Sequence, residues 1–289
     1  MSAIDLTGFW EAWPLFEDAV LAGTIAGVLL GVVGVYIVLN RMVFVSAALS
    51  QTASLGVTLA YFLQTLGVSS AIASPSLGAS ILSLSALTLI WRNDEMARAR
   101  RDSMLGVIFL IGASGTLIVA SRIVQEMHDV QTLLFGTSVA VLPEDFRLIL
   151  VFGAVIVGLY LWWWRGFVEV TYDEATASVR DMPVRFIKVV LMITVALAVS
   201  ICTRVLGALP AFAFGVFPAM GAIALAPNIP RAVVLAAVLG GLSGFGGYLC
   251  AYLFELPVGA AQTMTGGFIW VSAVSVSWML SKSRVLQED

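Results

Sequence analysis

Residues 19–40 read AVLAGTIAGVLLGVVGVYIVLN and contain no charged side chain over 22 residues. A helix needs about 20 apolar residues to cross the hydrocarbon core of a bilayer, so this stretch is long enough to span it. A membrane-spanning strand would alternate apolar and polar residues, whereas the run VLLGVVGVYIVL (28–39) does not alternate. The stretch therefore predicts a transmembrane helix, because a helix satisfies its own backbone hydrogen bonds inside lipid.

The same pattern repeats along the chain. Further charge-free stretches cover residues 42–91, 103–121, 148–164, 189–203, 205–230, 232–254 and 256–281. The first of these is 50 residues long and must hold two helices, with the break near Gly67 to Pro75. The sequence predicts an all-α integral membrane protein, a polytopic bundle of about eight to nine transmembrane helices.

Charged residues are scarce in the whole chain. The 15 Lys/Arg and 18 Asp/Glu residues make up 11% of 289 residues, and the mean hydropathy is +0.99. A soluble domain carries about 25% charged residues, so a soluble enzyme and a disordered chain are both excluded. The net charge of −3, with no basic block, argues against nucleic acid as a partner. Cys202 and Cys250 lie in apolar runs and predict small buried residues rather than a disulfide.

The basic residues indicate an orientation. If the spans alternate, 12 of the 15 fall on one side of the membrane, in residues 41, 92–101, 165–188, 231 and 282–284. The positive-inside rule places that side in the cytoplasm, for a multi-pass protein of the inner (plasma) membrane. Residues 1–18 are then an extracytoplasmic or interfacial lead-in, and residues 282–289 a cytoplasmic tail. An odd number of spans fits this orientation, with the N-terminus outside and the C-terminus inside. If residues 1–19 do not lie on the outer side, the number of spans is eight.

Two segments differ from ordinary spans. Residues 130–143 are apolar but too short to cross, which predicts a re-entrant or interfacial hairpin on the outer side. Residues 205–230 contain three prolines and three glycines that predict a broken helix, namely Pro210, Pro218 and Pro227 with Gly207, Gly215 and Gly221. Broken helices at membrane depth face protein or a water-filled cavity, so this segment, with Pro218 and Met220, is the first candidate for a translocation path.

The loop over residues 165–188 is the largest polar feature on the cytoplasmic side. It predicts a short helix from Asp173 to Arg180, with Asp173 and Glu174 favourably placed at the positive end of the helix dipole. The loop is either a solvated cap on two helices or a docking element for a soluble partner. A second, basic loop (91–102) suits anionic membrane lipid.

The sequence shows no site through which the chain itself could couple transport to ATP or to protons. It has no G-x-x-x-x-G-K-[ST] motif for ATP, and the charge-free stretches hold no ionisable side chain for a proton relay. We therefore expect any free energy for transport to come from a partner subunit.

Four stretches resemble permeases of the zinc, manganese and iron ABC importer family. They are residues 21–63, 101–121, 133–141 (LLFGTSVAV) and 204–226 (RVLGALPAFAFGVFPAMGAIALA). The resemblance implies a permease subunit, not an enzyme, with no cofactor of its own and with ATP bound by a separate ABC ATPase. It also implies an extracytoplasmic substrate-binding protein and a second permease copy in a homodimer. The ATPase-coupling residues it implies are Tyr172, Asp173, Glu174 and Arg180.

Members of that family commonly carry G-D-A-L-S-H-A where this chain has SAALSQT at residues 46–52. Ala47 thus stands in place of the acid and Gln51 in place of the histidine, and a neutral amide is a poor ligand for zinc. We expect Ser50 and Gln51, with Pro218 and Met220, along the translocation path. The alternative for the polar pair is a helix–helix contact.

Two further patterns concern a metal and helix packing. His128, the only histidine, lies beside Asp129 on the outer side and indicates a transient cation-receiving site or part of the mouth where a binding protein docks. The alternative to both is a solvated loop. Gly240 and Gly244 predict a close helix crossing, whose partner is another span or a second copy of the chain.

The function predicted is the transmembrane permease subunit of an ABC importer for divalent metal cations, namely zinc, manganese or iron. One alternative is an ABC permease for another substrate, such as a metal chelate. The other is a membrane scaffold that transports nothing, which the missing acid and histidine favour.

Overall fold

A computed structural model describes residues 9–10, 13–69, 72–92, 98–123, 141 and 143–288, and these residues contain helices and no strand. The helices are α2 (Trp13–Leu39), α3 (Val43–Thr65), α4 (Pro75–Arg92), α5 (Arg98–Ile123), α7 (Pro143–Trp162), α8 (Trp164–Tyr172), α9 (Glu174–Val179), α10 (Val184–Leu206), α11 (Ala208–Leu225), α12 (Ile229–Phe254) and α13 (Val258–Glu288). The predicted all-α class is confirmed.

Eight of the described helices are long and apolar enough to cross a membrane: α2, α3, α5, α7, α10, α11, α12 and α13. The helix α4 has a shorter apolar part, Pro75–Ile90. The prediction of two helices in residues 42–91 is confirmed, because α3 ends at Thr65 and α4 begins at Pro75. Gly67, in the connection, has a φ of 88°, which favours glycine.

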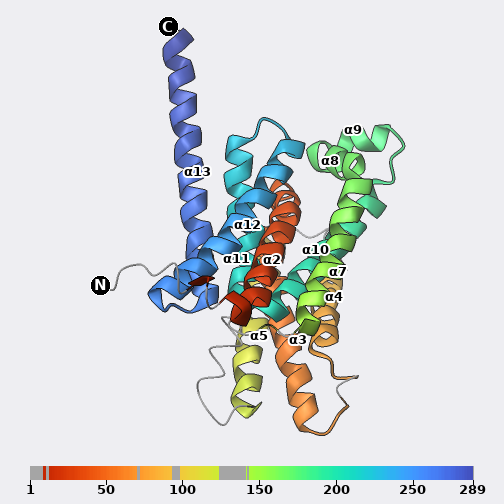
Figure 1. Cartoon of the computed structure of the whole chain (residues 1–289). Coiled ribbons are helices and arrows are strands. Elements are labelled where there is room, and N and C mark those ends of the chain that lie inside the picture. The colour runs from red at the N-terminus through yellow and green to blue at the C-terminus, as the bar shows by residue number, and fades with distance from the viewer. Residues whose placement is uncertain are drawn as a thin grey trace.

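The helix α2 lies at the centre of the bundle. It contacts α7 and α10 on one side and α11 and α12 on the other, an arrangement that can be followed in Figure 1. A helix that is apolar all round is one that is buried, and most residues of α2 are indeed buried. Figure 1 also places the short helices α8 and α9 at the same end of the bundle as the C-terminal end of α13, while α3 and α4 connect at the opposite end.

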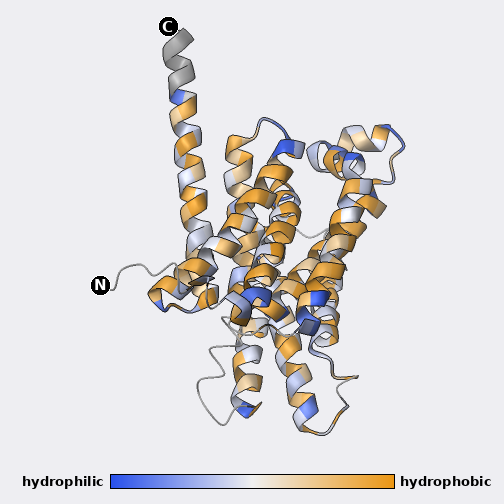
Figure 2. Ribbon diagram, in the orientation of Figure 1, coloured by the Kyte–Doolittle hydropathy of each residue, from blue (hydrophilic) through white to orange (hydrophobic). Residues whose placement is uncertain are grey.

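The outer helices expose apolar side chains over long faces. Few residues of α5, α7 and α13 are buried within the chain, and Figure 2 shows hydrophobic residues along the outside of the bundle. In water such large apolar faces would favour aggregation, whereas in a membrane they contact lipid.

Glycines bring α2 and α12 into backbone contact. A Cβ atom added to Gly27 would lie 2.2 Å from the carbonyl oxygen of Gly240, and one added to Gly244 would lie 2.4 Å from that of Gly23. The predicted close crossing at Gly240 and Gly244 is therefore confirmed. Its alternative partner, a second copy of the chain, is wrong, because α2 already covers this glycine face.

The helical run over residues 205–230 is interrupted at Gly207, as predicted, and again between Leu225 and Ile229, where Pro227 lies. Gly207 has a φ of 93°, which L side chains rarely adopt, and it alone separates α10 from α11. The helix α11 continues through Pro218, so the expectation of a helix broken there is wrong. Pro210 is tolerated because it lies in the first turn of α11, where backbone N–H groups have no helical partner.

Candidate functional site

The predicted short helix in the polar loop between α7 and α10 is present as α9, with Asp173 as its N-terminal cap. Oδ1 of Asp173 accepts hydrogen bonds from the backbone N–H groups of Ala175 (3.0 Å) and Thr176 (3.2 Å). The Thr176 hydroxyl donates to Oδ2 at 2.5 Å. These bonds, the Thr176 hydroxyl first, hold the pKa of Asp173 below its ordinary value. The carboxylate therefore fixes where α9 begins.

The helix α9 presents apolar side chains away from the bundle. Tyr172, just before it, is 84% exposed, and Val179 at its end is 82% exposed. Ala177 is buried on the opposite face, against the main core. Glu174 is the first residue of α9, and its side chain lies outside the described part of the structure. We call Tyr172, α9 and Arg180 the dock.

An ion pair joins Arg180, which follows α9, to α8. A guanidinium nitrogen of Arg180 lies 3.6 Å from a carboxylate oxygen of Glu169 on α8. Both side chains are exposed, so the pair orients the dock more than it stabilises the fold.

The helix α8 was not predicted from the sequence, although its residues anchor the dock. Phe167 and Val170 are buried, one helical turn apart. The ring of Phe167 stacks on Tyr160 of α7, with ring centroids 4.8 Å apart. The Asn40 side chain, at the end of α2, donates to the Thr171 hydroxyl at 3.2 Å. The signal in the sequence was the i, i+3 spacing of Phe167 and Val170, which is weak over nine residues.

The polar pair of α3 lies inside the bundle. The Ser50 hydroxyl is buried and donates to the backbone carbonyl of Ala47 at 2.9 Å. Gln51 lies where α3 meets α5, because a Cβ atom added to Gly112 of α5 would be 3.0 Å from the Cβ of Gln51. The side-chain oxygen of Gln51 is buried and has no hydrogen-bond donor. An unsatisfied buried acceptor is uncommon in folded proteins and is available to a ligand or to water.

Pro218 and Met220 lie on α11, which contacts both α2 and α3. Pro218 is buried, whereas Met220 is 36% exposed, so the two side chains do not share one environment. Within the described residues, no hydrogen bond joins Ser50 or Gln51 to α11. The helices α3 and α11 thus lie in contact. The role of these four residues in a translocation path stays a prediction.

A second buried amide was not predicted. Gln262 on α13 is completely buried, and its side-chain nitrogen donates to the carbonyl oxygen of Gly244 at 3.2 Å. Its oxygen, like that of Gln51, has no donor. A Cβ atom added to Gly23 would lie 2.6 Å from the Gln262 nitrogen, so the amide fits only because α2 and α12 carry glycine there. Gln262 fastens α13 to the α2–α12 pair.

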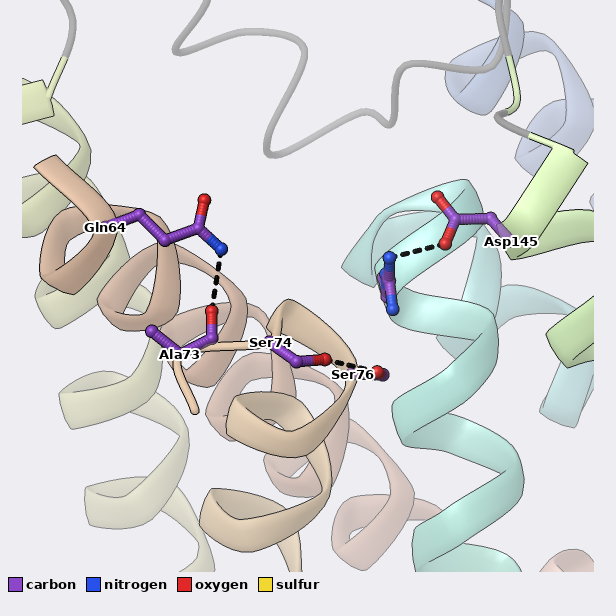
Figure 3. Close-up of polar contacts among 6 residues, drawn as sticks. Gln64, Ala73, Ser74, Ser76 and Asp145 are labelled. Carbon is purple, nitrogen blue, oxygen red and sulfur yellow. Dashed lines mark hydrogen bonds and ion pairs between the residues drawn. The ribbon is translucent and has the colours of Figure 1, made fainter. Parts of the chain in front are cut away.

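An ion pair joins α7 to α10 at the end of the bundle opposite the dock. A guanidinium nitrogen of Arg204 lies 2.5 Å from Oδ1 of Asp145, and the two side chains are only 12% and 14% exposed. Figure 3 shows Asp145 facing α10, with the hydroxyl pair of Ser74 and Ser76 (2.8 Å) at the start of the neighbouring α4. The pair was not predicted, because the two residues are far apart in the sequence.

The described residues contain no group of three or more His, Cys, Asp or Glu side chains that could hold a metal ion. His128 and Asp129 lie outside the described residues, as does most of the expected hairpin over residues 130–143. The predicted cation-receiving site at the outer side therefore stays a prediction.

A family model described as the ABC 3 transport family matches residues 12–277. The chain belongs to this family. The match covers every long helix from α2 to most of α13, and the sequence resemblance to metal importer permeases is thereby confirmed. The chain is a multi-pass membrane permease of the ABC transport type.

Two curated relatives of this ABC 3 chain are membrane proteins of metal transport systems. One is the manganese transport system membrane protein MntC of Listeria monocytogenes, 23% identical over 262 residues and 90% of each chain. Another is the high-affinity zinc uptake system membrane protein ZnuB of Haemophilus influenzae, 23% identical over 88% of this chain and 94% of that protein.

A solved structure has the same fold. PsaBC from Streptococcus pneumoniae, in complex with Fab, contains a chain that matches with a TM-score of 0.81 and 22% identity. The match covers 93% of this chain and 95% of that chain. The arrangement of helices described above is thus an experimentally observed fold.

Proposed function

We propose that this permease carries divalent metal ions, manganese, zinc or iron, into the cytoplasm, and that a separate ATPase subunit drives it. Membership of the ABC 3 transport family and the names of the manganese and zinc relatives support the metal. The scarcity of charge within the spans supports an external energy source, since the chain has no ATP-binding motif.

The dock is the observation that carries the ATPase role. Tyr172, at the end of α8, and Val179, at the end of α9, expose large apolar side chains on two short helices that lie outside the set of candidate spans. The Asp173 cap and the Arg180–Glu169 pair hold α9 in place before any partner arrives. A preformed helix with exposed apolar side chains suits docking to a soluble protein, because little ordering entropy is lost on binding.

The charge distribution supports a cytoplasmic dock. The C-terminal end of α13 lies at the same end of the bundle as α8 and α9 (Figure 1). Twelve of the 15 basic residues belong to the segments assigned to that side. By the positive-inside rule, the dock and the C-terminal tail face the cytoplasm of an inner (plasma) membrane protein.

We further expect a second permease copy, as a homodimer, and an extracytoplasmic binding protein that delivers the substrate. Ser50 and Gln51 on α3, with Pro218 and Met220 on α11, remain our candidates for the path. The unpaired oxygen of Gln51 supports a polar role there, since it is free to accept a hydrogen bond or contact a cation.

A second candidate substrate is a metal chelate. Gln51 is neutral, and Ala47 contributes no ligand atom from its side chain. A bare divalent cation binds anionic or imidazole ligands more strongly than a neutral amide. A chelate that masks the ion's charge would suit a path with neutral walls. A scaffold that transports nothing is the remaining alternative.

Co-purification tests the ATPase role. We expect the double variant Asp173→Arg with Arg180→Glu to lose at least about tenfold of its affinity for the ATPase subunit, equivalent to about 1.4 kcal/mol. The control is Lys282→Glu on α13, on the same side but outside the dock, which should retain the ATPase. Full ATPase association by the double variant would show that the dock is assigned wrongly.

The metal content of cells tests the substrate. We expect cells that lack the chain to contain less manganese, zinc or iron when grown on low concentrations of the free ions, and re-expression to restore it. If only a chelated form of the metal restores growth and content through this permease, the chelate is the substrate. If cells that lack the chain contain as much of all three metals as the parent cells, on free ions and on chelated metal alike, the scaffold alternative is favoured.

A further inference from the structure

Phe167 on α8 is completely buried although α8 is not a membrane span. Its ring stacks on Tyr160 of α7, with ring centroids 4.8 Å apart and planes inclined by 29°. It meets Tyr36 of α2 edge-on at 6.0 Å and Trp163 edge-on at 6.3 Å. One side chain next to the dock therefore touches two spans, the central α2 and the outer α7.

Tyr160 extends this contact to α10. Its hydroxyl lies 3.1 Å from the Thr194 hydroxyl. Thr194 donates its own hydrogen to the backbone carbonyl of Leu191 at 2.8 Å. Tyr160 is therefore the donor to Thr194, since a threonine hydroxyl has one hydrogen to give. The bond links α7 to α10 through Tyr160, the residue on whose ring Phe167 stacks.

A third connection ties the end of α8 to α2. The Asn40 amide nitrogen donates both to the Thr171 hydroxyl (3.2 Å) and to the Tyr36 carbonyl oxygen (2.8 Å). Displacement of α8 would break these bonds unless the end of α2 moved with it.

The same two spans, α7 and α10, are joined again at their far ends by Asp145 and Arg204. Asp145 and Tyr160 are about 15 residues apart on α7, which is roughly 22 Å along a helix. Two side-chain contacts this far apart couple the two helices at both ends, so that movement of one helix carries the other with it. The pair can tilt as a unit more easily than one helix can slide along the other.

We propose that Phe167 and Tyr160 are positioning residues that transmit movement of the dock to α7 and α10. The Arg204–Asp145 pair carries that movement to the opposite end of the bundle. This inference rests on the proposed ATPase role of the dock and adds the residues through which the dock acts. Transport per ATP hydrolysed depends on this connection, whereas binding of the ATPase depends on the exposed dock.

The coupling ratio tests the inference. The permease and its ATPase subunit are reconstituted in vesicles, and uptake of Mn²⁺ or Zn²⁺ is measured against ATP hydrolysis. We expect Phe167→Ala to keep ATPase association and hydrolysis while uptake per ATP falls about tenfold, within the range typical of coupling between sites. Phe167→Leu and Tyr160→Phe should fall less, because each keeps part of the contact. Phe268→Ala, an exposed phenylalanine on α13, is the control and should not change the ratio.

A distance measurement tests the inference without reference to the transported ion. Spin labels are placed at Leu66, after α3, and at Leu209, in the first turn of α11, both exposed and both opposite the dock. Cys202→Ala and Cys250→Ser remove the native thiols. We expect ATP to change the label distance in the permease–ATPase complex and the change to be lost in Phe167→Ala. A purely structural role for Phe167 would lower protein yield but leave the ATP response intact.

The outcomes separate the two proposals. If the unaltered permease does not bind the ATPase, the proposed function fails. If it binds and responds to ATP, and Phe167→Ala responds equally, the transmission role is overturned while the dock stands. If Phe167→Ala does not fold, Tyr160→Phe and Phe167→Leu decide, and an unchanged coupling ratio and label response in both overturns the inference.

Discussion

The α2–α12 contact and the α7–α10 contact hold helices together in opposite ways. Where α2 meets α12, glycines let the backbones touch, and no side chain lies between Gly27 and Gly240. Where α7 meets α10, two pairs of side chains join the helices, Tyr160 with Thr194 and Asp145 with Arg204. Backbone contacts have one geometry, whereas side chains can change rotamer. The comparison suggests a fixed half of the bundle around α2 and α12 and an adjustable half around α7 and α10.

The largest effect is expected from filling the fixed contact. Gly27→Ala places a Cβ atom about 2.2 Å from a backbone oxygen of α12, which forces the helices apart and should destabilise the fold by about 3 kcal/mol. The matched control is Gly106→Ala on α5, where nothing lies within 4 Å. That variant should be as stable as the parent, or up to about 1 kcal/mol more stable, because alanine favours the helix. Unfolding in detergent measures both, and equal stability of the two variants would contradict a tight α2–α12 contact.

The next effect is expected at the end of the adjustable contact that lies opposite the dock. Arg204→Ala leaves the Asp145 carboxylate largely buried without a partner. We expect a loss of about 2 kcal/mol, less than the ~3–5 kcal/mol of a completely buried pair, because both side chains retain some exposure. Adding Asp145→Ala should recover part of the loss, since the orphaned charge is then removed. A double variant less stable than Arg204→Ala would argue against the ion pair.

A smaller effect is expected at the other end of the same two helices. Tyr160→Phe keeps the ring on Phe167 but removes the bond to Thr194. The loss should be about 1 kcal/mol, as for one hydrogen bond. Tyr61→Phe on α3, where the ring is partly exposed, is the control for removing a tyrosine hydroxyl. Identical unfolding curves for the two variants would show that the α7–α10 contact does not need this bond.

The smallest effect is expected outside both contacts, at the dock. Asp173→Ala removes the cap of α9 without touching a span. Backbone amides of residues 175–179 should then exchange with deuterium faster, while the amides of α7 and α10 stay unchanged. Faster exchange in α10 as well would mean that the dock and the adjustable half unfold together.

The pH dependence of the cap follows from the lowered pKa of Asp173. A lowered pKa means that the carboxylate stabilises α9 fully above the ordinary aspartate value of about 3.9 and loses this effect as the pH falls through the lowered value. After correction for intrinsic rates, protection of residues 175–179 should therefore not change with pH near neutrality, and it should fall as the pH drops through the lowered pKa of Asp173.

Sequence patterns predicted the parts of this molecule that depend on local chemistry. The lack of charge in residues 42–91 was enough to predict α3 and α4, because a bilayer fixes helix length. Asp173 predicted the start of α9, because a cap acts within three residues. Gly240 and Gly244 predicted a close crossing, but the spacing of glycines marks a face and does not reveal which helix covers it.

Contacts between distant residues could not be predicted in this way. Arg204 and Asp145 each resembled a charge at the end of a span, and only the fold brings them together. The burial of Phe167 was not predicted because it lies in a short amphipathic helix. The contacts of Gln262 were not predicted because the glycines that make room for it lie on α2 and α12. The roles of Ser50, Gln51, Pro218 and Met220 depend on a path through the assembled transporter, so they stay predictions.

The single residue between α10 and α11 limits the range of any motion. One extended residue spans at most about 3.6 Å, which is less than the 5.4 Å rise of one helical turn. Gly207 is that residue, and α11 is held against α2 by a contact of Gly34 with Gly215 close enough that an added Cβ would lie 2.3 Å from a carbonyl oxygen. The far end of α10 is thus tethered to the fixed half of the bundle. It can pivot about Gly207 but cannot travel a full turn along its own axis.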